Sequence, residues 1–151
     1  MQAYYNILDK LRTELLLDKF VNTVTQGDIF DVDLEKQSIF PLSHIILNNA
    51  SRNGSTYTVN ISMMCMDIVN ITSEEVIDKF RGNDNEQDVL NTQWAVGARV
   101  IEMLERGGLR DLNMALSGTP LFEPFTERFE NYLAGWTVSF DIDIPNDMTI
   151  C

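Results

Sequence analysis

The residues of this chain with the clearest capacity for chemistry are carboxylates at every second position of two predicted strands. Segments 30–35 and 136–144 both alternate apolar and polar residues. Successive side chains of a strand point to opposite faces, so the apolar residues face a core and the carboxylates face water. We therefore predict a sheet with one buried face and one acidic face. The five carboxylates of that face are Asp31, Asp33, Glu35, Asp141 and Asp143.

The spacing of these carboxylates does not match a metal-binding or catalytic motif. An EF-hand loop that began at Asp31 would require glycine and glutamate where the chain has Lys36 and Leu42. A glycosidase pair must flank its substrate, and one strand carrying Asp141 and Asp143 does not define that geometry. The pattern favours a solvated strand face, and we predict no metal site, no cofactor and no catalytic residue.

His44 and a sulfur-rich segment are the other candidates for chemistry. His44 is the only histidine, and catalysis would require a nucleophile and an orienting acid beside it. We predict a structural or surface role for it in strand 42–47. Segment 63–66 contains three methionines and Cys65, which could bind a soft metal, but methionine in a strand usually fills a core. We favour the core interpretation.

Length and composition indicate one acidic domain spanning residues 1–151. The chain has 44% hydrophobic residues, and 23 Asp and Glu against 11 Lys and Arg give a formal charge of −12. A chain so acidic is a poor ligand for nucleic-acid phosphates or an anionic membrane. Two cysteines are too few for a disulfide scaffold. No signal peptide is recognised, so we expect an intracellular protein or a particle assembled inside a cell.

The periodicity of the chain predicts two helices and two further strands. Residues 2–21 carry an apolar stripe at helical spacing, and so do residues 86–106. Segments 42–47 and 57–65 read as strands, joined by an eight-residue polar loop at 48–55. We expect the two strands to pair as a long antiparallel hairpin whose tip projects.

The remaining segments are less regular. Residues 72–80 resemble a short capped helix, whereas residues 109–126 fit no single pattern. Trp94 and Trp136 are predicted to pack a helix against the sheet. The element order predicts an α+β fold: a largely antiparallel sheet with a long β-hairpin and two main helices packed on one face.

This order of elements resembles the tail-terminator and tail-completion proteins of tailed bacteriophages, which form rings at the head–tail junction. The matching features are the opening helix at 7–16, an acidic segment running into Phe40 and Pro41, the hairpin, and helix 86–106. Segment 134–147 is also similar to the ends of neck and tail ring proteins, including those of crAss-like phages. The likeness is one of pattern along nearly the whole chain.

The resemblance implies a structural virion protein with no enzymatic activity. It would form a homo-oligomeric ring of six or twelve subunits between a portal or connector and the tail or other ring proteins. The ring would be assembled in the host cytoplasm and would line the channel for genomic DNA, which passes without specific binding. Carboxylates facing that channel would repel phosphates, as the composition independently suggests. The expected channel-facing residues are the five carboxylates of the acidic face.

Two other functions are compatible with the sequence. The first is an acidic adaptor or inhibitor that mimics DNA, which would be a monomer or dimer competing with DNA for a basic partner. The second is a hydrolase that uses aspartate and glutamate around a divalent metal at an unrecognised site. Native mass separates the ring from the mimic, and metal-dependent melting would favour the hydrolase.

Overall fold

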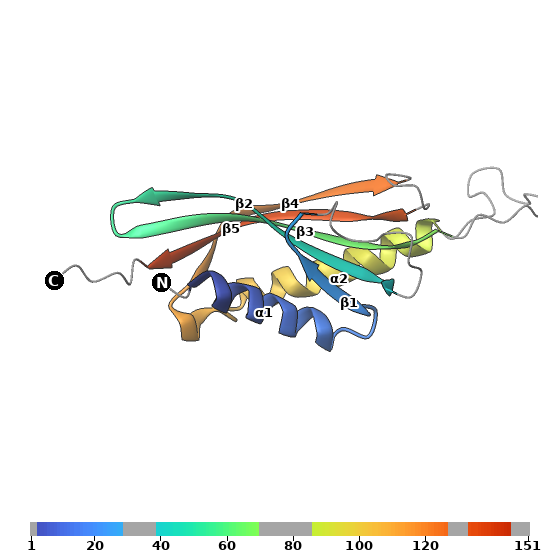
Figure 1. Cartoon of the computed structure of the whole chain (residues 1–151), viewed down its shortest axis with the longest axis horizontal. Coiled ribbons are helices and arrows are strands. Elements are labelled where there is room, and N and C mark those ends of the chain that lie inside the picture. Colours follow the sequence, from blue (N-terminus) through green and yellow to red (C-terminus); the bar gives the residue numbers. More distant parts are fainter. Residues whose placement is uncertain (1–2, 29–38, 70–85, 127–132, 146–151) are drawn as a thin grey trace, which may run out of the picture.

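The computed structural model describes residues 3–28, 39–69, 86–126 and 133–145. Within them, two α-helices and a five-stranded sheet form the fold (Figure 1). In chain order the elements are α1 (Ala3–Leu17), β1 (Thr23–Gln26), β2 (Leu42–Asn53), β3 (Thr56–Ile68), α2 (Glu86–Glu105), a 3₁₀ turn at Arg110–Leu112, β4 (Ala115–Thr126) and β5 (Leu133–Pro145).

The sheet has the strand order β1-β2-β3-β5-β4. Only β1 and β2 are parallel, and the other three pairs are antiparallel. Both helices lie on the same side of this sheet, below it in Figure 1. The predicted α+β class is therefore confirmed, with its largely antiparallel sheet, long hairpin and helix-covered face.

The main core lies between the helices and the sheet because the apolar stripe of each helix faces the alternating apolar residues of the strands. Leu11 and Leu15 of α1, Val96 of α2, and Ile61 and Val138 of the sheet are fully buried in one cluster. A smaller apolar cluster lies on the opposite face of the sheet, toward one end. Its buried members are Phe40, Leu42, Met64, Met66, Phe125 and Leu133.

The hairpin is longer than predicted, and the prediction of a polar loop at 48–55 is wrong. Residues 48–53 continue β2, and the turn is limited to Gly54 and Ser55. A run of polar residues suggested a loop. In the structure this run is part of the strand, and Asn48 shows how a polar side chain can bond to the neighbouring strand. Asn48 donates to both Asn60 and Ser62 of β3. Polar side chains on a strand face can therefore be satisfied by hydrogen bonds to the neighbouring strand.

Three other expectations need adjustment. Helix α1 ends at Leu17, four residues before the predicted end, where Asp18 begins a turn by donating its N–H to the Leu15 carbonyl. Residues 109–126 resolve into the 3₁₀ turn and the edge strand β4. Trp94 of α2 packs against Trp136 of β5 as predicted, but it is 52% exposed and is therefore not a core residue. The predicted strand at 30–35 and helix at 72–80 fall outside the described residues.

Candidate functional site: the polar face of the sheet

The side of the sheet that no described helix covers carries a continuous set of polar side chains, which we call the polar face. Its members come from three adjacent strands, β2, β3 and β5. They are Asn48, Thr58, Asn60, Ser62, Ser139, Asp141 and Asp143. On β5 these positions alternate with Val138, Phe140 and Ile142, which point into the main core. Strand alternation alone thus places Asp141 and Asp143 opposite the helices, as predicted.

Hydrogen bonds across the strands fix the two aspartates of the polar face. Thr58 donates its hydroxyl to the Asp143 carboxylate at 2.7 Å, and Asn60 donates its amide N–H to Asp141 at 2.7 Å. The side-chain amide oxygen of Asn60 in turn accepts a hydrogen bond from the side-chain amide of Asn48 at 2.7 Å. All these donors are neutral, so the hydrogen bonds orient the carboxylates without compensating their charge. Both aspartates are half-buried, not fully solvated as their alternation suggested.

The chain segregates its charges between the two sides of the sheet. The described basic residues lie on or after the helices, at the 3₁₀ turn, or at the hairpin tip. They are Lys10, Arg12, Lys19, Arg52, Arg99, Arg106 and Arg110. Arg52, the only one on a strand, lies 5.6 Å from the ring of Tyr57, which packs toward the helix-side core. Among the described residues, the polar face therefore has acidic groups and no basic group.

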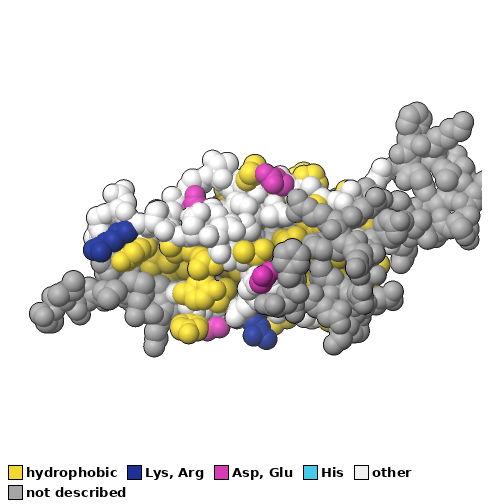
Figure 2. All heavy atoms as spheres, turned by 45° about the horizontal axis from the view of Figure 1, so that its top comes forward, with side chains coloured by type: hydrophobic (Ala, Val, Ile, Leu, Met, Phe, Trp, Pro, Cys, Tyr) yellow, Lys and Arg dark blue, Asp and Glu magenta, His cyan; other side chains and the backbone are white. Residues whose placement is uncertain are grey.

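The space-filling view agrees with this segregation. Figure 2 turns the upper side of the sheet toward the viewer, and its Lys and Arg side chains appear only at the left end and the lower edge. The described upper part of this view shows neutral polar groups with scattered acidic ones, and a band of hydrophobic side chains lies below them. Sequence reasoning missed one acidic residue here: Glu123 of β4 pairs with Thr137 and is exposed. The irregular pattern of 109–126 concealed it.

Of the five predicted acidic-face residues, the structure brings two together. Asp141 and Asp143 lie side by side on β5. Asp31, Asp33 and Glu35 lie outside the described residues, so their inclusion in the same surface stays a prediction. In the described part of the chain, no group of three or more His, Cys, Asp and Glu side chains could hold a metal ion.

His44 has the structural role that the sequence predicted, and it joins β1 to β2. It is fully buried, and its Nε2 lies 2.8 Å from the Gly27 carbonyl oxygen, which can only accept. Nε2 must therefore carry the proton, and Nδ1 of the neutral ring accepts from the Thr25 hydroxyl at 2.6 Å. Both side-chain bonds reach residues in or next to β1, a strand of only four residues.

This arrangement predicts a specific pH dependence of stability. Burial lowers the pKa of His44 below its ordinary value of 6.5, opposed by the Gly27 hydrogen bond and by Asp28. The unfolded chain therefore takes up a proton more readily than the folded chain. The contribution of neutral His44 to the free energy of unfolding is complete above pH 6.5 and declines as the pH falls through the lower pKa of the folded state. Urea unfolding of the wild type and His44→Gln at several pH values should give stability curves that converge toward low pH. Because the chain has one histidine, parallel curves would contradict this role.

The sulfur-rich segment is core, also as predicted. Met63, Met64, Cys65 and Met66 are all buried. Burial raises the pKa of the Cys65 thiol to about 12, and the Ser43 hydroxyl donates weakly to its sulfur at 3.9 Å. Cys65 is therefore a protonated thiol at neutral pH and is unsuited to act as a nucleophile.

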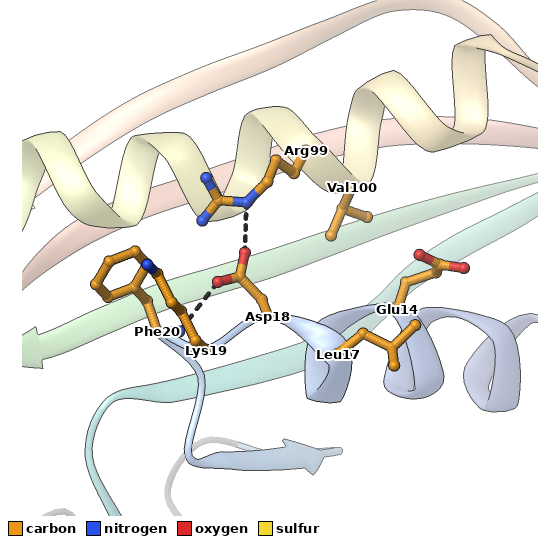
Figure 3. Close-up of a pocket in the computed structure, with 7 residues that line it drawn as sticks. All are labelled: Glu14, Leu17, Asp18, Lys19, Phe20, Arg99 and Val100. Atoms are coloured by element: carbon orange, nitrogen blue, oxygen red, sulfur yellow. Dashed lines mark hydrogen bonds and ion pairs between the residues drawn. The ribbon is translucent and has the colours of Figure 1, made fainter.

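A second surface feature lies on the helix side, between the end of α1 and the middle of α2, and we call it the α1–α2 groove (Figure 3). It has a volume of about 440 Å³. Its lining residues are Glu14, Leu17, Asp18, Lys19, Phe20, Arg99 and Val100. Asp18 fixes its geometry, since one carboxylate oxygen accepts from Arg99 Nε at 2.6 Å and the other from the Phe20 backbone N–H at 3.0 Å.

No protein-family model matches the chain, and no curated protein matches it significantly. None of the described helices is long and apolar enough to span a membrane.

Proposed function

We propose that this protein is a structural subunit of a homo-oligomeric ring at the head–tail junction of a tailed bacteriophage. Its polar face would line the channel through which genomic DNA passes toward the tail. The observation that carries the proposal is the charge segregation across the sheet: Asp141 and Asp143 lie on a helix-free face without described basic groups. The pattern resemblance to tail-terminator proteins supports the same function.

The physical requirement of a DNA conduit is that the wall must not bind phosphate. Proteins bind duplex DNA by placing Lys and Arg against its backbone, and carboxylates at the same positions repel it. Rotational symmetry would repeat Asp141 and Asp143 six or twelve times around the channel. Their fixed orientation by Thr58 and Asn60 would keep the carboxylates on the channel wall as DNA moves.

Ring formation also requires two different surfaces on each subunit, because closed rings use head-to-tail interfaces. The helix side offers exposed apolar side chains at both ends of α1: Tyr5 toward its N-terminus, and Leu16 and Leu17 at its C-terminus. These positions leave the polar face free. Portal, connector and tail proteins would contact the remaining surfaces above and below the ring.

Native mass tests this function most directly. Light scattering after gel filtration should give a mass six or twelve times the 17.2 kDa of one chain, and electron microscopy of that fraction should show rings with a central channel. The channel wall in class averages should coincide with the sheet and not with the helices. A species that stays monomeric or dimeric at the highest soluble concentration would contradict the ring.

The acidic face favours one other candidate, a protein that mimics DNA. Carboxylates fixed on a sheet can replace phosphates in front of a basic partner, as Asp141 and Asp143 would do here. Such a protein would be a monomer or dimer and would displace DNA from that partner. The mass measurement therefore distinguishes the two functions.

A further inference from the structure

We propose that the α1–α2 groove receives residues 146–151 of a second copy of this chain. This inference rests on the proposed function in one respect, which is that the neighbour in the assembly is another copy. The segment would link each subunit to the next by an exchanged arm. Three features carry the proposal: the exposed apolar lining of the groove, the two cations beside Phe20, and the distance between the groove and the end of β5.

The groove exposes apolar groups that the fold itself does not use. Leu17 is 76% exposed and Phe20 is 40% exposed, although both lie beside the buried stripe of α1. Figure 3 shows Leu17 and Phe20 on the α1 side of the groove, with Arg99 and Val100 above them on α2. Exposed apolar groups beside a hollow of about 440 Å³ can receive one or two apolar side chains.

Two cations lie beside Phe20, in a lining that also includes Glu14 and Asp18. Lys19 Nζ lies 5.1 Å from the Phe20 ring, and the Arg99 guanidinium lies 5.9 Å from it. Asp18 bonds to Nε of Arg99, which leaves the terminal nitrogens directed away from that carboxylate in Figure 3. Lys19 and the terminal nitrogens of Arg99 can therefore pair with an acidic group of a ligand whose apolar side chains enter the groove.

Residues 146–151 have that composition. The segment contains Asp147 between the strand end and two apolar residues, Met148 and Ile150. Asp147 can meet Lys19 and Arg99 at the rim, while Met148 and Ile150 can contact Leu17 and Phe20. Methionine adapts readily to irregular apolar hollows.

The segment cannot reach the groove of its own subunit. The groove lies near the start of β1, and Thr23 of β1 aligns through Leu42 and Met66 with Gly135 of β5. Ten residues of β5 separate Gly135 from Pro145, or about 33 Å along the strand. Six extended residues span at most about 21 Å. In Figure 1 the end of β5 lies at the left, whereas α1 runs from that side toward the middle, so that its C-terminal end lies away from the end of β5. A copy of residues 146–151 that binds in the groove must therefore come from a neighbouring subunit.

A labelled peptide tests the groove separately from ring formation. A fluorescent peptide of residues 145–151, with Cys151→Ser to prevent oxidation, is titrated with the full-length protein and followed by anisotropy. We expect saturable binding. The Leu17→Glu substitution should weaken it at least tenfold, because it replaces an apolar side chain of the groove with a negatively charged one. The matched control is Leu121→Glu, an equally drastic change at a 54% exposed position on β4, which should leave binding unchanged. An Asp147→Lys peptide should bind more weakly than the original.

The possible outcomes separate the proposal about the groove from the proposal about the ring. Absence of saturable binding, or equal weakening by Leu17→Glu and Leu121→Glu, would overturn the arm exchange even if rings form. Peptide binding that depends on Leu17 in a protein that never forms rings would uphold the groove and overturn the ring. Loss of rings in Leu17→Glu without any peptide binding would assign the groove to a different occupant.

Discussion

The Asp141→Asn, Asp143→Asn double variant is expected to bind duplex DNA more tightly than the wild-type protein. The asparagine side chains retain an oxygen that accepts from Thr58 and Asn60, so the polar face should keep its structure. Only the negative charges disappear, and symmetry multiplies that loss around a ring. We expect duplex affinity to rise about tenfold at low salt, with a smaller increase at higher salt because of screening.

The control for this experiment is a variant with the same charge change on the helix side. Asp88 and Asp111 are both exposed, on α2 and at the 3₁₀ turn. The Asp88→Asn, Asp111→Asn variant has the same net charge as the polar-face variant. Fluorescence anisotropy with a labelled duplex should show an increase for the polar-face variant alone. Equal changes in both variants would mean that net charge, and not the polar face, keeps DNA away.

The second large effect is expected from Gly135→Ala in β5. A Cβ at this position would overlap the Cys65 carbonyl oxygen and would lie 2.8 Å from the Met66 Cα. Both obstacles are backbone atoms of β3, so no side-chain rotation relieves the clash. The central strands would have to separate, and we expect the free energy of unfolding to fall by on the order of 3 kcal/mol or more. Urea unfolding monitored by circular dichroism measures this loss.

Gly118→Ala in β4 is the matched control for Gly135→Ala. Gly118 has a φ of +67°, but a Cβ there would meet nothing within 4 Å. The substitution carries only the strain of a left-handed residue, about 1 kcal/mol. If both variants lose the same stability, the close approach of β3 and β5 at Gly135 is not the decisive constraint.

Several elements were predictable because their patterns are local. The alternation in 136–144 fixed β5 and assigned Asp141 and Asp143 to the face opposite the core. The helical stripe in 86–106 located α2, and the alternation in 57–65 located the centre of β3. Each pattern follows from the geometry of one element, so no tertiary information was needed.

Other elements depend on partners that are distant in sequence. Strand β4 lacks clean alternation because its pairing with β5 shifts register between Ser117 and Leu121. Residues 48–53 look like a loop in isolation, and they are strand because Asn60 and Ser62 supply partners for Asn48. The groove also escaped prediction, since Asp18 and Arg99 are 81 positions apart and meet only when α1 packs beside α2.

The sequence by itself determined the α+β class, the acidity of the chain and the outward direction of Asp141 and Asp143. Periodicity and charge are properties of single segments, and the local backbone geometry expresses them directly. Only the tertiary structure decided that described cations stay off the polar face, that His44 joins β1 to β2, and that Leu17, Phe20 and Arg99 form one groove. Those features arise where separate elements meet, and their meeting is set by the packing of the whole core.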